Sequence, residues 1–416
     1  MTASLPTGSW WLGALAQFVF IYPVAMGVVW MVGGLCFWWW RERRRTPSSP
    51  DTWLTVSILV PCHNEAKAIA ATCENLAGLD YPSYQVIFID DASADDTQAI
   101  LRDHIDATPT FHLLHLPRNQ GKARALNAAL ALVKTPLVLV LDADTRLRDD
   151  ALRLLAAPFT RQPRLGAVTA NPIPLNRKGF WGRFQAAEFS SIIGLIKRCQ
   201  RVWGRLFTVS GCATIFSARV LREAGGFSPA TATEDIDITW RIQRAGYEVW
   251  FEPAAVAYIQ VPACFSEYWR QRRRWALGGW HLLRGHRGVF SSRRWRRLWP
   301  VYLDSALGYL WAFAFVGLSL AELLALTIGW RAPVVVSPIP AWPGAVVSVV
   351  CVTQMAVAAR INGTHDPDLR RCLFWIPWYP LLFFAVSAIV AVGTAPEGLL
   401  GRLDRVGLWQ RPTRDG

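Results

Sequence analysis

The stretch from Leu137 to Thr145 constrains the fold more than any other segment. Five apolar residues, Leu137-Val-Leu-Val-Leu141, run directly into Asp142 and Asp144. Such a run is typical of a strand buried on both faces, as in parallel sheets covered by helices. The residues after such a strand lie at the carboxyl edge of the sheet, where open α/β folds bind ligands. Two carboxylates there suit a divalent cation that holds a diphosphate, although an isolated Asp-x-Asp is more often a turn.

The preceding segments predict an α/β domain around this strand. Further strands are expected over residues 56–60, 85–89 and 111–116, and helical stretches separate them. This alternation predicts a mostly parallel sheet. Polar clusters follow two of these strands, Pro61-Cys-His-Asn-Glu65 after the first and Asp90-Asp91 after the second. These polar clusters are therefore expected at one edge of the sheet, which is the predicted location of a ligand crevice.

Long apolar segments at both ends predict membrane spans. Residues 10–40 are too uniform for a signal peptide and too short for two spans, so one tilted helix is expected. Arg41-Glu-Arg-Arg-Arg45 follows and places that end in the cytoplasm. Three more apolar segments cover residues 301–328, 342–359 and 372–392. Counting the spans places the tail outside the cytoplasm, but its arginines favour the cytoplasmic side. The topology from Cys372 onward therefore stays open.

The composition agrees with a membrane protein. The net charge is +14 and 52% of the residues are hydrophobic, with the arginines clustered beside apolar runs. No nucleic-acid-binding module is recognisable, so nucleic acid is not an expected partner. The eight cysteines form no C-x-x-C pair, which argues against a zinc site or a disulfide framework. Cytoplasmic, reduced thiols are expected.

The predicted organisation has six parts. They are a transmembrane helix over 10–40, a basic juxtamembrane linker over 41–52, the α/β domain over 53–255, interface helices over 256–300, a transmembrane region of about three spans over 301–394, and a tail over 395–416. The interface helices are expected because Gln271-Arg-Arg-Arg-Trp275 lies among tryptophans, a pattern typical of amphipathic helices on a membrane surface.

Three other groups of polar residues need an interpretation. Thr233-Glu-Asp-Ile-Asp237 precedes an amphipathic run, so a plain helix-capping role is the alternative to a functional one for Glu234 and Asp235. His112 and His115 are three apart on a strand and should point to opposite faces, so a shared metal is not expected. Asp304 and Glu322 lie inside an apolar segment, where carboxylates are costly and need a partner helix or a polar pathway.

Four motifs in this order resemble the processive family 2 glycosyltransferases, which make cellulose, chitin, hyaluronan and poly-N-acetylglucosamine. The motifs are Asp91, Asp142-x-Asp144, Thr233-Glu-Asp235 and Gln271-Arg-Arg-Arg-Trp275. The segments that most resemble the bacterial poly-β-1,6-N-acetylglucosamine synthases are Met31-Val-Gly-Gly34 with Arg41-Glu-Arg43, residues 190–198, Val209-Ser-Gly211 and residues 233–238. The resemblance runs from about Phe18 to the last span. Two departures are the lack of an extra N-terminal span that some members carry, and His63 where relatives usually have Phe or Tyr.

The resemblance implies a GT-A-type nucleotide-sugar transferase domain inserted between transmembrane helices in the bacterial inner membrane, with the catalytic domain cytoplasmic. The implied reaction is inverting, processive transfer of N-acetylglucosamine from UDP-N-acetylglucosamine to a growing β-1,6-linked chain, coupled to export as a biofilm exopolysaccharide. A small membrane subunit and regulation by cyclic di-GMP are implied with it. The first span and the three apolar segments toward the carboxyl end give about four spans. An export path needs a polar route through the membrane, so this small number also favours a second subunit.

The resemblance assigns roles to residues of this chain. Asp235 is the expected general base on the acceptor hydroxyl. The other expected contacts are Pro61, His63, Asn64, Glu65 and Asp91 for the uridine, Lys122 near the diphosphate, Asp142 and Asp144 for Mg²⁺ or Mn²⁺, Glu234 for the substrate, and Gln271, Arg274 and Trp275 closing over donor and acceptor. Arg274 would meet the diphosphate and Trp275 would stack on the terminal sugar.

Three alternatives stay open. The chain could make another β-linked polymer of the hyaluronan, chitin or cellulose type. It could be a non-processive transferase acting on lipid-linked sugars, although the Gln-x-x-Arg-Trp motif argues against this. It could be a transport or scaffold protein with a degenerate transferase domain, against which the four carboxylates Asp91, Asp142, Asp144 and Asp235 argue. Turnover of UDP-sugars with a divalent ion separates the last alternative from the others.

Overall fold

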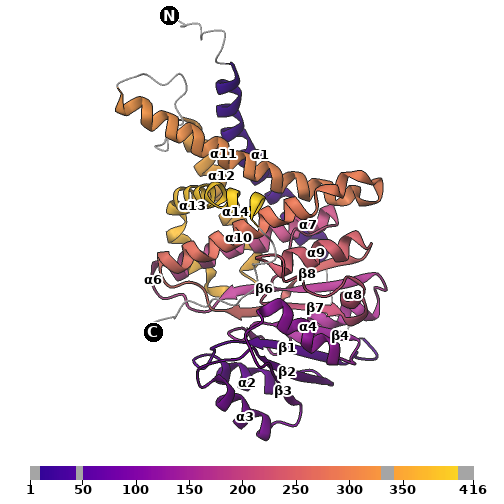
Figure 1. The fold of residues 1–416 in the computed structure, drawn as a ribbon. Coiled ribbons are helices and arrows are strands. Elements are labelled where there is room, and N and C mark those ends of the chain that lie inside the picture. The colour runs from indigo at the N-terminus through magenta and orange to yellow at the C-terminus, as the bar shows by residue number, and fades with distance from the viewer. Residues whose placement is uncertain (1–9, 44–49, 329–341, 402–416) are drawn as a thin grey trace, which may run out of the picture.

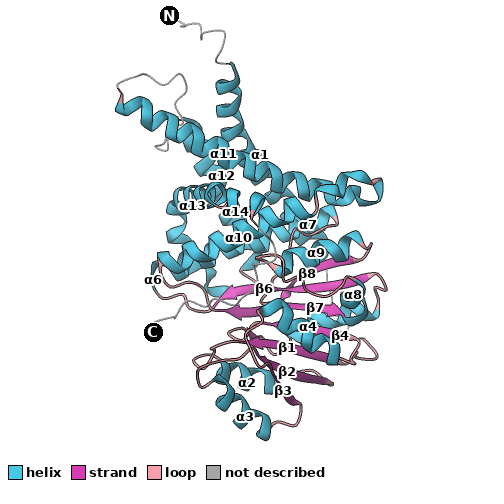
Figure 2. Cartoon of the chain, viewed as in Figure 1, coloured by secondary structure: helices cyan, strands magenta, loops and turns pink. Residues whose placement is uncertain are grey.

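The computed structural model describes residues 10–43, 50–328 and 342–401 (Figure 1). A strand layer occupies the lower half of the molecule, and long helices occupy the upper half (Figure 2). Helices α7, α9 and α10 lie between the two. Residues 44–49 of the linker predicted over 41–52, and residues 402–416 of the predicted tail with its arginines, lie outside the described residues.

One eight-stranded sheet forms the core of the lower half. Its order is β3-β2-β1-β4-β7-β6-β8-β5. The strands are β1 Val56–Cys62, β2 Tyr84–Asp90, β3 Phe111–His115, β4 Leu137–Leu141, β5 Arg146–Leu147, β6 Leu165–Pro174, β7 Ala213–Ser217 and β8 Glu248–Ile259. Strands β3, β2, β1 and β4 are mutually parallel, as are β6 and β8, whereas β7 and β5 run antiparallel to their neighbours. The mostly parallel sheet predicted from the sequence is confirmed.

The central strands are buried because helices cover both faces of the sheet. Every residue of β4 is buried. Leu137, Leu139 and Leu141 belong to the apolar core on one face, and Val138 and Val140 to the core on the other. This alternation explains why the strand lacks any polar position. The helices of this domain are α2 Ile69–Ala77, α3 Thr97–Ala107, α4 Lys122–Leu132, α5 Ala151–Ala156, α6 Gly179–Glu188, α7 Ile196–Trp203, α8 Ala218–Glu223 and α9 Glu234–Arg244.

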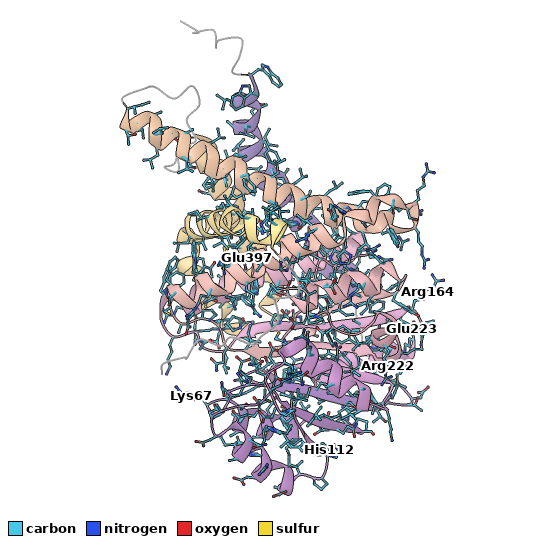
Figure 3. All side chains as sticks on the ribbon, viewed as in Figure 1. Lys67, His112, Arg164, Arg222, Glu223 and Glu397 are labelled. Atoms are coloured by element: carbon cyan, nitrogen blue, oxygen red, sulfur yellow. The ribbon has the colours of Figure 1, made fainter. Side chains whose placement is uncertain are left out.

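The register brings the polar strand ends together. Strand β1 lies between β2 and β4, with Cys62 opposite Asp90 and Leu59 opposite Val140. The segments that come after β1, β2 and β4 therefore leave the sheet at one edge. The two histidines of β3 have different surroundings: His115, the last residue of the strand, contacts Asp90 at this edge, whereas the exposed His112 lies at the outer end of the molecule (Figure 3).

Four helices among the described residues are long and apolar enough to cross a membrane. These candidate spans are Trp10–Glu42, Arg293–Thr327, Gly344–Asn362 and Leu382–Leu400. The α-helices on this side are α1 Trp10–Phe37, α10 Phe265–Gly285, α11 Trp299–Thr327, α12 Trp342–Asn362, α13 Tyr379–Gly393 and α14 Ala395–Leu400. The 3₁₀ and π turns of the described residues are Trp38–Glu42 (η1), Ala157–Thr160 (η2, after α5 in the α/β domain), Phe189–Leu195 (η3), Arg287–Ser291 (η4), Arg293–Leu298 (η5) and Pro367–Trp378 (η6).

The last apolar segment differs from its prediction. The sequence predicts a span over residues 372–392, but Pro367–Trp378 is a 3₁₀ helix and the α-helix of this segment is Tyr379–Gly393. Pro377 and Pro380 explain the shift. Pro377 disfavours the α conformation of the residue before it, whereas Pro380 lies in the first turn of the α-helix, where its missing N–H has no partner to lose, so the helix begins at Tyr379.

The first span is packed closely against the catalytic domain. A Cβ added at Gly33 would lie 2.4 Å from Cys199 Sγ, and one added at Gly34 would lie 2.3 Å from Leu195 Cδ1. Beside this contact the fully buried Arg198 donates to both carboxylate oxygens of Glu42, each at 2.8 Å, and to Asn362 Oδ1 at 2.7 Å. One arginine thus ties the end of the first span to α7 and to α12.

Asp304 has a partner within the chain. The Tyr22 hydroxyl of α1 donates to the backbone oxygen of Asp304 at 3.0 Å and lies 3.1 Å from its Oδ1. The carboxylate was expected to need a separate partner helix or the polymer path, and α1 supplies that partner. Glu322, the other carboxylate of α11, is partly exposed.

Candidate active site

A cluster of charges lies at the shared edge of the strands. Lys122, the first residue of α4, places its Nζ 2.6 Å from Asp142 Oδ1 and 3.1 Å from Glu234 Oε1. It also donates to the backbone oxygen of Gly211 at 3.3 Å. The end of β4, the start of α4 and the start of α9 therefore meet at one ammonium group.

The Asp142 and Asp144 pair has the donor chemistry of a cation site. Burial raises the pKa of Asp142, and the charge of Asp144 raises it further, whereas Lys122 opposes the shift. The side chain of Asp142 is still 34% exposed, so it is open to a ligand. In the part of the chain that the structure describes, no three His, Cys, Asp or Glu side chains gather as a metal cage. Mg²⁺ is commonly held by one or two carboxylates together with substrate phosphates, which fits this pair.

Asp235 lies on the first turn of α9, beside the cluster. Burial is the main cause that raises the pKa of Asp235 to about 6, and Glu234 adds to the effect while Lys122 and Arg274 oppose it. A Cβ on Gly211 would lie 3.1 Å from Asp235 Oδ2, so the glycine leaves the space in front of the carboxylate open. The pKa of Glu234 moves the other way: burial would raise it, but Lys122 and Arg274 hold it below its ordinary value.

Local capping accounts for only part of the bonding at this helix start. The N-cap residue is Thr233, and its side chain makes no cap hydrogen bond. Asp235 Oδ1 accepts only from the adjacent amide of Ile236, at 3.0 Å. Glu234 is turned to Lys122 instead. The helix begins where the sequence predicts, but its acidic residues face the cluster because tertiary contacts outweigh local capping.

Asp91 is buried and holds the loop that leads into α4. Its Oδ1 accepts from the amide of Gln120 and its Oδ2 from the amide of Gly121, both at 2.8 Å. Gly121 adopts a φ of +83°, which only glycine adopts readily, and Lys122 comes directly after it. The predicted contact of Asp91 with the uridine would have to use the remaining acceptor capacity of these two oxygens.

The other predicted uridine residues lie along the end of β1. His63 Nδ1 is 2.8 Å from the backbone oxygen of Asp91, and its Nε2 is 3.1 Å from Asn119 Nδ2. The carbonyl acceptor assigns the ring proton to Nδ1 and leaves Nε2 as the acceptor for the amide. Pro61 is in β1, and Asn64 Oδ1 accepts from Ala94 at 2.8 Å. Glu65 is buried, and its amide donates to Thr97 Oγ1 at 2.7 Å.

Helix α10 brings the Gln271-to-Trp275 motif to the start of α9. A Cβ on Gly278 would lie 2.0 Å from Thr233 Oγ1, so the two helices touch there. Arg274 acts electrostatically on both Glu234 and Asp235. The ring centroid of Trp275 is 6.2 Å from that of Phe189, and Gln271 is partly buried. The structure thus collects Lys122, Asp142, Asp144, Glu234, Asp235 and Arg274 at one edge, with His63 and Asp91 at the ends of the neighbouring strands β1 and β2.

Sequence reasoning assigned no role to Lys197, which is 5% exposed. Its Nζ donates to Ser210 Oγ at 2.6 Å, and Ser210 precedes the glycine that faces Asp235. Burial lowers the pKa of Lys197 to about 8, and the charges of Cys212 and Asp235 oppose that shift. The available signal was a lysine that comes after the apolar run Ile192-Ile-Gly-Leu-Ile196, where a charged side chain needs a buried partner.

Comparison with known proteins adds two findings. A family model described as glycosyl transferase family 2 matches residues 57–225. The chain is 30% identical over 407 residues to the poly-β-1,6-N-acetyl-D-glucosamine synthase of Staphylococcus aureus strain COL, with 96% of this chain and 98% of the relative covered. Its counterpart from Staphylococcus epidermidis strain RP62A is 29% identical over 405 residues, with the same coverage.

A solved structure supports the fold. The mannosyltransferase PcManGT from Pyrobaculum calidifontis, in complex with GDP-Man and Mn²⁺, superimposes with a TM-score of 0.60. The match covers 91% of this chain and 98% of that one at 20% identity. At this level of identity the likeness shows a shared fold alone.

Proposed function

Because this chain belongs to the glycosyl transferase family 2 and is a membrane-bound enzyme of that family, we propose that it transfers N-acetylglucosamine from UDP-N-acetylglucosamine to a growing β-1,6-linked chain. The near full-length similarity to poly-β-1,6-N-acetyl-D-glucosamine synthases supports the substrate. The observation that carries the chemistry is Asp235, a partly buried carboxylate of raised pKa, beside the cluster of Lys122, Asp142 and Glu234.

Asp235 is the proposed general base. A pKa of about 6 leaves it ionised at neutral pH and still basic enough to take a proton from an acceptor hydroxyl. The acceptor oxygen then forms a bond to the anomeric carbon, while the bond from that carbon to UDP breaks and its electron pair leaves with the diphosphate. One displacement inverts the anomeric centre, so no covalent nucleophile is needed.

Cationic side chains face the position proposed for the leaving diphosphate. Lys122 lies within the cluster, and Arg274 reaches it from α10. Asp142 and Asp144 would hold Mg²⁺ or Mn²⁺, which when bound neutralises charge on the departing diphosphate. Lys122 is paired with Asp142, so we propose that it can turn toward a phosphate when a cation takes over that carboxylate.

The uridine is proposed to bind along the ends of β1 and β2. Pro61, His63, Asn64, Glu65 and Asp91 line this region. The His63 ring is fixed by hydrogen bonds at both nitrogens, which leaves its face for stacking on a base. Gln271 and Trp275 would close the acceptor side from α10, and Glu234 would keep Lys122 beside the substrate.

Processivity, export and the membrane orientation belong to the same proposal. The catalytic domain would face the cytoplasm of a bacterial inner membrane, and the polymer would leave across it. A small membrane subunit would complete the path, and cyclic di-GMP would regulate it. Purified chain in liposomes with UDP-N-acetylglucosamine and Mg²⁺ tests the subunit: delivery of long polymer to the lumen without a second protein would contradict it.

Incubation of membranes containing this chain with individual UDP-sugars, followed by linkage analysis, tests the substrate. We expect consumption of UDP-N-acetylglucosamine alone and a β-1,6-linked product. A β-1,4-linked or mixed product would identify a synthase of the chitin, cellulose or hyaluronan type. Transfer of a single sugar to lipid would identify a non-processive enzyme, and no turnover of any UDP-sugar would contradict catalysis.

A further inference from the structure

Helix α10 carries a buried face that the proposed roles of Gln271 and Arg274 do not use. Tyr268, Arg272 and Trp275 are spaced i, i+4 and i+7, so they share one side of the helix. Tyr268 is fully buried and Arg272 is 6% exposed. This side packs toward α6, which precedes the π-helical turn η3.

A buried ion pair anchors this face. Arg272 Nη2 donates to Glu188 Oε2 at 2.5 Å, and Glu188, at the end of α6, is 1% exposed. The other carboxylate oxygen of Glu188 accepts from the Tyr268 hydroxyl at 3.3 Å. Burial raises the pKa of Glu188 and the charge of Arg272 opposes the shift. Two charges this far from water are tolerated only as a pair, which fixes the guanidinium in position.

The guanidinium in turn lies against two aromatic rings. Arg272 Cζ is 4.1 Å from the centroid of the Trp275 ring and 4.5 Å from that of Tyr268. A planar guanidinium stacks on aromatic faces in a way that a lysine ammonium does not. Phe189, tilted at 55° to the indole, touches Trp275 from η3. Arg272 therefore determines the direction in which the partly exposed Trp275 ring faces.

The neighbouring arginines have different surroundings. Arg273 is 54% exposed and pairs with Glu397, which lies on the membrane-side helices close to α10 (Figure 3). An exposed pair of this kind contributes little to stability. Arg274 instead faces Glu234 and Asp235. Of the three consecutive arginines, only Arg272 is buried and stacked on the indole.

We propose that Arg272, held by Glu188, is a positioning residue that sets the plane of Trp275 for the terminal sugar of the acceptor. This inference rests on the proposed function, in which Trp275 carries that sugar. Arg272 does not touch the donor side of the cluster. Its replacement should therefore weaken acceptor binding and shorten the product, and leave donor use unchanged.

The test uses the purified full-length chain and separates two reactions. Release of UDP without acceptor measures donor use, and transfer to a soluble β-1,6-linked N-acetylglucosamine oligosaccharide measures acceptor use. Arg272→Lys keeps the charge for Glu188 but loses the planar stack. Arg272→Met combined with Glu188→Gln removes both charges together, so no lone charge is left buried. Arg273→Met is the matched control, because it removes a neighbouring exposed arginine from the same helix.

We expect Arg272→Lys and the double variant to raise the acceptor KM about tenfold, with an unchanged KM for UDP-N-acetylglucosamine. Product chains should be shorter, and Arg273→Met should behave as wild type. In a Trp275→Ala background, Arg272→Lys should not raise the acceptor KM further, because the effects of two substitutions are not additive when one residue acts through the other.

Other outcomes overturn the inference. A wild-type acceptor KM in Arg272→Lys contradicts it, as does a parallel loss of acceptor and donor use, which would mark a merely structural arginine. An equal KM increase with and without Trp275 shows that Arg272 does not act through that ring. If the wild-type chain does not use UDP-N-acetylglucosamine at all, the proposed function fails first, and the acceptor role of Trp275 fails with it.

Discussion

At the scale of single residues, two neighbouring carboxylates at one edge of the sheet have pKa values shifted in opposite directions. Glu234 and Asp235 are adjacent in sequence, yet the pKa of one is lowered and that of the other is raised to about 6. The pKa of Glu234 is lowered because Lys122 Nζ is 3.1 Å from its carboxylate, whereas Asp235 makes no direct ion pair with any residue that the structure describes. Perturbed groups of this kind in a ligand crevice are typical of catalytic sites. Asp235 is therefore the carboxylate to alter first.

Replacement of Asp235 by Asn should abolish transfer and leave UDP binding nearly intact. The amide keeps the shape of the side chain but cannot accept the proton of the hydroxyl, and such a base contributes about 10²–10⁴-fold to the rate. Initial rates with UDP-N-acetylglucosamine, together with calorimetric titration of UDP, measure both effects. Residual transfer above about a tenth of the wild-type rate would contradict the assignment.

The pH dependence of transfer should show an acid limb near pH 6. The ionised form of Asp235 is the active one, and burial and Glu234 raise its pKa from 3.8 to about 6. As the pH falls through that value the base becomes protonated, so kcat/KM should fall about tenfold for each further pH unit. A profile that stays flat from pH 7 down to pH 5 would show that another group takes the proton. UDP binding measured over the same range separates this effect from loss of donor affinity.

Removal of the divalent ion should stop the reaction. Asp142 and Asp144 are the proposed ligands, so activity lost in excess chelator should return with Mg²⁺ or Mn²⁺. Asp144→Ala should not recover at any concentration of either ion, whereas Asp149→Ala, which removes an exposed carboxylate five residues later, should respond as wild type. Undiminished activity in excess chelator would remove the metal role of this pair.

At the scale of elements, local sequence patterns predict the strands well and their neighbours less well. The strand ends could be predicted to within two residues, because the apolar runs stop close to Cys62, Asp90 and Leu141; the sequence placed the first two ends at residues 60 and 89. The antiparallel β7 between β4 and β6 carries no comparable signal, since its place depends on pairing with Leu137–Leu141, more than seventy positions earlier in the chain.

The same limit applies to the site. Asp142 and Asp144 could be singled out from their place directly after a buried strand, whereas Asp235 stood out only through its motif in the resemblance to the family 2 glycosyltransferases. The pairing of Glu188 with Arg272 could not, because it joins helices 84 positions apart and neither residue stands out in its own segment. Lys197 and Ser210 are closer in sequence, but their contact depends on how α7 packs on the sheet. Pairs that exist only after tertiary packing leave no local pattern to read.

The contact between α9 and α10 leads to a prediction with an internal control. Gly278→Ala should reduce transfer strongly, because its Cβ would lie 2.0 Å from Thr233 Oγ1 and push the motif of α10 away from Asp235. Overpacking of this kind costs about 1–3 kcal/mol. Gly285→Ala, at the end of the same helix, meets nothing within 4 Å and should be neutral. Initial rates and thermal unfolding of the two variants decide the matter, and equal activities would show that α10 tolerates displacement.

At the scale of the whole molecule, the first membrane helix is part of the catalytic unit. Glu42, at its end, is paired with the buried Arg198, and Lys197, the preceding residue of α7, contacts Ser210 beside the site. Asn362 connects the same arginine to α12. A span that only anchored the enzyme would need none of these contacts. The helices proposed to cross the membrane therefore help to hold the segment that faces Asp235.

Gly33→Ala should lower the stability of this assembly. The added Cβ would lie 2.4 Å from Cys199 Sγ and 3.1 Å from Cys199 Cα, so the backbone of α7 has to move. We expect a loss of about 1–3 kcal/mol and a lower Tm in detergent, with a fall in transfer because α7 carries both Lys197 and Arg198. Gly13→Ala, on the same helix, meets nothing within 4 Å and should leave both quantities unchanged. If the two variants have the same Tm and the same transfer rate, the first span only anchors the enzyme. The contacts from Glu42 through Arg198 to the site would then contribute nothing to stability or transfer.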